Sequence, residues 1–203
     1  MKRFTDAVRS ALVQRNWYAA LALAVTLPDM CVSIENGQKA TWREYAGWFD
    51  AWVGRRYIVE FKYYNEDHAN DPASFIQQAH EEGRLGGLVR KGMNYTKQEV
   101  FLSGVDCYCL RCSYSHEASG DISTQRIRES INKFIFVYKD GGISLHKNQS
   151  TGVDGVVKLQ LDVEIFCLDL CKGVDDWLSD AEKQQKVLAV SSLLSIHPSS
   201  AGF

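Results

Sequence analysis

Leu102-Ser-Gly-Val-Asp-Cys-Tyr-Cys-Leu-Arg-Cys-Ser-Tyr-Ser-His-Glu-Ala-Ser-Gly120 determines how the rest of this chain can pack. Apolar side chains recur through it at helical spacing and predict a helix that is apolar nearly all the way round, and therefore central. They are Phe101, Leu102, Val105, Tyr108, Cys109, Leu110 and Cys112. Just upstream, Thr96-Lys-Gln-Glu99 has the pattern of a capping box. The helix is therefore expected to begin there.

Two charged side chains interrupt this apolar pattern near its end. Arg111 and His116 lie five positions apart, which separates them by roughly 140° on an ideal helix. They share a pocket only if the helix unwinds at about Ser115. The polar run that follows makes such an ending plausible, with Gly120 as the residue just after the helix.

The same residues resemble a known superfamily. Arg111-Cys-Ser-Tyr-Ser-His116 fits the Arg-x4-6-His motif of HEPN proteins, and Tyr108 to Glu117 is similar to the Tyr/Leu-Arg-Asn-x-x-x-His-Gly form common there. The resemblance implies a helical bundle, usually dimeric, in which two motifs face each other and often cleave RNA without metal or cofactor. It also implies a cytoplasmic toxin or phage-defence protein, with an antitoxin or regulatory protein as a further partner.

The chemistry expected of such a motif is simple. A histidine can take the proton of a ribose 2′-hydroxyl or give one to the leaving 5′-oxygen, and an arginine fork can bind the phosphate. Arg111 and His116 are then the catalytic residues, with Asp106, Cys112 and Glu117 supporting or orienting them. The structural alternative is that Arg111 pairs with a carboxylate such as Asp106 or Glu117, while His116 only finishes a helix.

A glycine-rich, basic segment from 83 to 93 precedes the central helix. Arg84, Arg90 and Lys91 in it are candidates to contact RNA phosphates, whereas the alternative is a flexible connection. The segment lacks the Gly-x4-Gly-Lys-Ser/Thr pattern of a nucleotide P-loop.

Composition limits the class of protein. With 203 residues, 45% hydrophobic content and a net charge of −2, the chain is typical of a soluble, single-domain globular protein without a generally basic surface. Any RNA contact must therefore be local. Six cysteines favour core positions in a reducing compartment, although Cys109, Cys112 and His116 share a helix face that could contribute to a metal site.

At the N-terminus, helical spacing predicts one amphipathic helix from about Thr5 to Leu27, with a buried second half, that stops before Pro28. Its apolar run is too short to span a membrane; a secretory signal is the minority interpretation. Asp29 could pair with Arg111, but an Asp that bonds its own turn is favoured.

Three further segments have helical signals. Thr41-Trp-Arg-Glu44 is a second capping box, and the stripe of Tyr45, Trp48, Phe49 and Trp52 that follows suits a core more than a base-stacking surface. Residues 55–64 suit a helix or a strand. Asp71-Pro72 predicts a helix from Ala73 to Glu82.

After Gly120 the chain changes character. A short helix is expected over 123–132, then a hairpin of 134–138 with 143–146 around Asp140-Gly-Gly142, and a third strand over 156–161. Asp162 should cap a helix through Trp177, and Ser179-Asp-Ala-Glu182 should open another through Leu194, ended by His197-Pro198. His146 and His197 are expected at the surface.

The sequence thus predicts one α+β domain over 1–203, mainly α, with a HEPN-like bundle and a small antiparallel three-stranded insertion near 133–161. Two functions fit it: a dimeric, metal-independent endoribonuclease, or a non-catalytic module that binds RNA, a nucleotide or a protein partner. Cys112, where the family often has Asn, Asp or His, favours the second. A cysteine-dependent metal protein is the third hypothesis.

Overall fold

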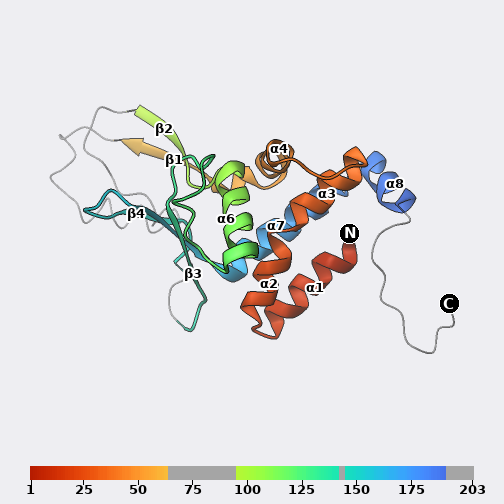
Figure 1. Cartoon of the computed structure of the whole chain (residues 1–203), viewed down its shortest axis with the longest axis horizontal. Helices are drawn as coiled ribbons and strands as arrows, with labels where there is room; N and C mark the ends of the chain where they lie inside the picture. The colour runs from red at the N-terminus through yellow and green to blue at the C-terminus, as the bar shows by residue number, and fades with distance from the viewer. Residues whose placement is uncertain (64–94, 142–144, 191–203) are drawn as a thin grey trace.

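A computed structural model describes residues 1–63, 95–141 and 145–190, and shows a mixed α+β fold that is mainly helical (Figure 1). Helix α6, Gly104–Glu117, lies in the middle of it, with the strands on one side and most of the other helices on the opposite side. It contacts α4, Trp42–Trp52, and also α2, Trp17–Ala24. The prediction of a central helix is confirmed.

The N-terminal segment forms three helices, so the prediction of one continuous helix is wrong. They are α1 (Lys2–Val13), α2 and α3 (Leu27–Asn36). The first break comes where Arg15 adopts a left-handed conformation, with φ of 54°, and Asn16 caps α2 by accepting from the amide of Ala19. Pro28 lies in the first turn of α3 instead of ending a helix, since a first-turn residue needs no amide hydrogen.

Residues Trp17–Asn36, which hold α2 and α3, form the one helical span in the described residues that is long and apolar enough to cross a membrane. Length and composition alone support that possibility. Since 44% of the span's apolar window is buried within the fold, a core helix accounts for the same composition.

The capping box at Thr41 is confirmed: Glu44 donates its amide to the Thr41 hydroxyl, and the amide of Thr41 donates to the Glu44 carboxylate at 2.8 Å. In α4, Tyr45, Trp48 and Phe49 are buried, as predicted for core residues. A short 3-10 helix, Gly54–Tyr57, follows the end of α4.

In the segment 55–64, which suited a helix or a strand, the 3-10 helix extends to Tyr57 and strand β1 occupies Ile58–Tyr63. It pairs antiparallel with β2, Tyr95–Val100, so the expected capping box at Thr96 is wrong. Pairing with a distant strand has overridden a local helix signal. The central helix begins later, where the side chain of Ser103 accepts from the amide of Asp106.

Three strands form the second sheet: β3 (Lys133–Val137), β4 (Asn148–Thr151) and β5 (Val157–Asp162), in the order β3-β5-β4. The third predicted strand is confirmed as β5. The hairpin and the all-antiparallel sheet are wrong, because β3 runs parallel to β5 and only β4 is antiparallel to it. The reason is burial: β5 carries the fully buried Leu159 and Leu161 and takes the centre, whereas the polar β4 is exposed and suits an edge.

The expected helix over 123–132 is absent, and these residues form irregular turns. The carboxylate of Asp106 accepts from the amides of residues 129, 130 and 131, and the amide of Ile122 donates to the carbonyl of Asn132. These bonds satisfy backbone groups that a helix would have paired internally.

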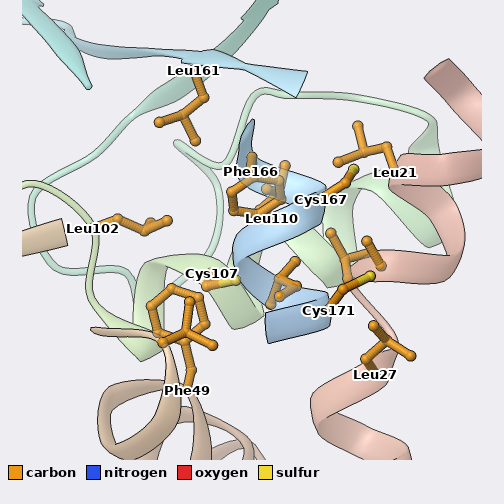
Figure 2. Packing of buried hydrophobic residues seen from close by; sticks show 14 of the residues in the cluster. Leu21, Leu27, Phe49, Leu102, Cys107, Leu110, Leu161, Phe166, Cys167 and Cys171 are labelled. Atoms are coloured by element: carbon orange, nitrogen blue, oxygen red, sulfur yellow. The ribbon is translucent and has the colours of Figure 1, made fainter. Parts of the chain in front are cut away.

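Helix α7, Val163–Trp177, is confirmed with its predicted cap: the side chain of Asp162 accepts from the amides of Glu164 and Ile165. Figure 2 shows how Cys107 and Leu110 of α6 lie beside Phe166, Cys167 and Cys171 of α7 in the core. Asp180, not Ser179, caps α8, Ala181–Ala189. The helix ends at Ala189, after which Val190 is extended, so the predicted end at Leu194 is wrong. His197 lies outside the described residues.

Candidate functional site

Helix α6 runs unbroken to Glu117, so the expected opening at Ser115 is wrong. The helix ends where Ala118 adopts a left-handed conformation with φ of 51° and its amide donates to the carbonyl of Tyr114 at 3.1 Å. Ala118 thus takes the role expected of Gly120. Arg111 and His116 therefore stay about 140° apart around the helix axis.

Most buried residues of α6 lie on the side packed against the core, namely Asp106, Cys107, Cys109, Leu110 and Ser113. The opposite side, called here the open face, carries half-buried to exposed residues, which are Val105, Tyr108, Arg111, Cys112, Ser115 and His116. At the N-terminal end of this face, Gly104 is buried because it packs against the backbone of Ala46 in α4. At 100° per residue, Arg111 lies at one edge of the open face and His116 at the other, with Tyr108, Cys112 and Ser115 between them.

An ion pair anchors Arg111. Its Nε donates to Oδ2 of Asp29, in the first turn of α3, at 2.7 Å. The favoured expectation, that Asp29 would bond only its own turn, is wrong; the pairing that had been the lesser alternative is present. Nη1 lies 4.0 Å from Sγ of Cys112, and in the described part of the chain no residue accepts from Nη2.

The pair is only partly screened from water, with 26% of the Arg111 side chain and 20% of the Asp29 side chain exposed. Burial raises the pKa of Asp29, although the Arg111 guanidinium acts in the opposite direction. Burial acts to lower the pKa of Arg111, but the charge and hydrogen bond of Asp29 together with the effect of Cys112 outweigh it, so this pKa is raised. The guanidinium is thus held cationic at the edge of the open face.

Tyr108, next to Arg111 on the open face, has a pKa raised to about 12 by burial and by its hydrogen bond with Cys112. Its ring also meets that of Tyr45 edge-on, with centroids 5.3 Å apart. Tyr108 therefore stays protonated at neutral pH and can donate or accept a hydrogen bond.

The three residues expected to support the motif have different surroundings. Cys112 contacts Arg111: its Sγ lies 4.0 Å from Nη1, which is compatible with the expected supporting role. The buried carboxylate of Asp106 accepts from backbone amides 129–131 and holds that loop. Glu117 is exposed in the last turn of α6. Arg84, Arg90 and Lys91, and the expected helix over 73–82, lie outside the described residues.

An exposed aromatic side chain at Tyr18 was not predicted from the sequence, because this residue was placed in the buried second half of one long helix. Its side chain is 79% exposed. The preceding Trp17 stacks on Tyr138, which follows β3, with ring centroids 5.7 Å apart and planes 16° apart. The Asn16 cap is the signal that could have revealed this, because a helix that restarts there has a new phase.

Five of the six cysteines are buried, as expected of core residues, and Cys112 is the half-buried one. Burial raises the pKa of Cys107 and Cys109 to about 12. Within the described ranges, no three His, Cys, Asp or Glu side chains are grouped as metal ligands.

His146 is not the surface residue that was expected. Its Nδ1 accepts from the amide of Asp162 at 3.2 Å, and its Nε2 is buried without a partner among the described residues. The ring lies edge-on to that of Tyr57, and burial together with the charge of Lys147 lowers the pKa of His146 to about 4.

Comparison with models of known protein families, with curated proteins and with solved structures found no match in any of the three.

Proposed function

We propose that this protein is a metal-independent endoribonuclease of the HEPN type, a cytoplasmic toxin or defence effector that acts as a homodimer. The observation that carries the proposal is the position of Arg111 and His116 at the two edges of the open face of α6. Asp29 holds the guanidinium at Nε and Cys112 Sγ lies 4.0 Å from Nη1, so Nη2 has no acceptor among the described residues. A guanidinium with a nitrogen available in this way suits a phosphodiester oxygen.

Two copies of α6 are needed, because about 140° separates Arg111 from His116 in one copy. If two open faces meet around a two-fold axis parallel to α6, the Arg111 edge of one protomer lies opposite the His116 edge of its partner. This arrangement produces two composite sites, each with one arginine and one histidine.

Chemistry at such a site needs only these side chains. His116 accepts the proton of the ribose 2′-hydroxyl as its oxygen attacks phosphorus, or protonates the departing 5′-oxygen. Arg111 neutralises the charge that develops on the phosphate oxygens. The products are a 2′,3′-cyclic phosphate and a free 5′-hydroxyl.

The test is incubation of purified protein with total RNA in the presence of a metal chelator, followed by analysis of the new ends. Wild type is expected to leave 2′,3′-cyclic phosphates. His116→Ala should cut at least about 100-fold more slowly while remaining folded and dimeric, because general acid–base catalysis contributes a factor of that size or more. Leu188→Ala, which alters an exposed side chain on α8, is the control and should cleave normally.

Retained cleavage by His116→Ala would contradict the proposal. Expression in cells gives an independent readout, since the wild type should arrest growth and His116→Ala should not. Co-purification with an antitoxin or regulatory protein would identify the partner.

A second candidate, a non-catalytic module that binds RNA, a nucleotide or a protein, is favoured by Cys112. Its thiol is only a weak acceptor for Nη1 at 4.0 Å, where the family often supplies Asn, Asp or His. Intact RNA at high protein concentration, together with measurable binding, would support this module instead. Replacement of Cys112 by Asn would then test whether the missing polar group limits catalysis.

A further inference from the structure

Beside the Arg111 edge of α6 lies a group of aromatic side chains, called here the aromatic ledge, made of Trp17, Tyr18 and Tyr138. Tyr18 and Tyr138 are 79% and 53% exposed, unusual values for large aromatic side chains. Trp17 and Tyr138 come from different elements and stack on each other, which fixes both ring planes. The ledge therefore presents to solvent the stacked pair of Trp17 and Tyr138 and, from the next residue of α2, the exposed ring of Tyr18.

The turn between α1 and α2 presents the ledge. Arg15, at its tip, holds a left-handed conformation that is costly for a residue with a side chain, and backbone bonds to Leu12 and Ala11 maintain it. Helix α2 then restarts at Asn16, with Tyr18 exposed and Trp17 half-buried against the edge of the core. Arg15 itself is exposed beside them.

A hydrogen bond joins the ledge to α6. The hydroxyl of Tyr114 donates to the backbone carbonyl of Tyr18 at 3.0 Å. Tyr114 lies three residues after Arg111, about 4.5 Å further along the helix and roughly 60° around it. The ledge thus adjoins the edge of the open face where a phosphate is proposed to bind.

Resting on the RNA substrate proposed above, we propose that the aromatic ledge stacks an unpaired base of a single-stranded RNA whose neighbouring phosphate binds Arg111. Base stacking on aromatic rings suits single strands, because the bases of a duplex are already stacked. Two exposed cations, Arg15 and Lys139, flank the rings in the sequence and suit a phosphate backbone. The flanking cations favour a nucleic acid over an apolar protein surface.

The experiment measures binding apart from cleavage. A fluorescent single-stranded 2′-O-methyl oligonucleotide, which lacks the attacking hydroxyl, is titrated with the full chain and followed by anisotropy. Tyr18→Ala should weaken binding about 5- to 150-fold, the range for removal of one base-stacking ring. Tyr18→Trp keeps an aromatic ring at this position and should bind the oligonucleotide as tightly as the wild type. Leu188→Ala, an equally exposed apolar residue on α8, is the control and should bind as the wild type does.

Three outcomes separate this inference from the proposed function. Unchanged binding by Tyr18→Ala overturns the ledge, whatever the cleavage assay shows. A shift from dimer to monomer in Tyr18→Ala, measured by sedimentation, also overturns it and identifies the ledge as a contact between copies of this chain. Binding that depends on Tyr18 in a protein that never cleaves RNA supports the ledge and counts against the ribonuclease.

Discussion

Asp29 accepts from Nε of Arg111 at 2.7 Å, and this bond joins the first turn of α3 to the middle of α6. Of the terminal guanidinium nitrogens, Nη1 lies 4.0 Å from Sγ of Cys112, and Nη2 has no acceptor among the described residues. Asp29 is therefore a positioning residue in the proposed site: it does not touch the phosphate but sets the orientation of the side chain that does.

The first prediction concerns this orientation. Asp29→Asn keeps the size of the side chain but replaces a charged acceptor with a neutral one, so the bond to Nε weakens and the guanidinium is held less firmly. We expect kcat for RNA cleavage to fall about 10- to 100-fold with a smaller change in KM, because small displacements of a catalytic group have effects of that size. Stability should fall by only about 1 kcal/mol, since the pair is partly exposed.

Steady-state kinetics on a short RNA, with urea denaturation of the same preparations, measure both quantities. Glu164→Gln, which neutralises an exposed carboxylate in the first turn of α7, is the matched control. An unchanged kcat in Asp29→Asn would show that Arg111 needs no such support.

The elements with strong local signals were predictable from sequence. The Thr41 capping box and the Asp162 cap both fix helix starts through bonds within one turn, and both are present. The apolar periodicity around Leu110 likewise identified the central helix, because a side chain buried on most sides needs apolar neighbours.

Elements that depend on distant partners could not be predicted from the sequence. Thr96 to Glu99 matches a capping box, yet these residues pair with β1, more than 30 positions upstream. The order β3-β5-β4 follows from the burial of Leu159 and Leu161, which local turn signals do not encode. The Asp29 partner of Arg111, 82 positions away, could be named only as one alternative.

The second prediction tests the close contact between α6 and α4. A Cβ on Gly104 would overlap the backbone of Ala46, with the Ala46 Cα only 2.7 Å away. Gly104→Ala should therefore destabilise the protein by about 3 kcal/mol, because backbone cannot yield as a side chain does. Gly47→Ala is the matched control: nothing lies within 4 Å, and it should stabilise α4 by about 0.5–1 kcal/mol. Equal urea midpoints for the two variants would contradict this packing.

The third prediction concerns Asp106, which supports the fold in this structure. Its buried carboxylate accepts from the amides of residues 129, 130 and 131, at 2.7, 3.3 and 3.4 Å. Asp106→Ala should lower the free energy of unfolding by about 3 kcal/mol, since several buried donors lose their acceptor. Hydrogen exchange should quicken at amides 129–131 before it does elsewhere.

Urea denaturation of Asp106→Ala beside Glu117→Ala provides the comparison. The Glu117 side chain is exposed, so its removal should change stability by less than about 0.5 kcal/mol. If both variants unfold at the same urea concentration, Asp106 does not hold the loop in solution.

The fourth prediction is a pH dependence that originates at His146. Its pKa is lowered to about 4 by burial and by Lys147, whereas an unfolded chain has a histidine pKa near 6.5. Above pH 6.5 the ring is neutral in both states and contributes no difference. As the pH falls from 6.5 to 4, His146 binds a proton in the unfolded state but stays neutral in the folded state, so the free energy of unfolding falls.

We expect the loss to be roughly 1–2 kcal/mol, because the part-exposed ring is screened by solvent. Urea denaturation at pH 7 and pH 4.5 measures it. His146→Asn is the control, since its amide oxygen replaces Nδ1 as acceptor for the Asp162 amide but does not titrate. The variant should lose less stability than the wild type between these two pH values; an equal loss in both proteins would place the titrating group elsewhere.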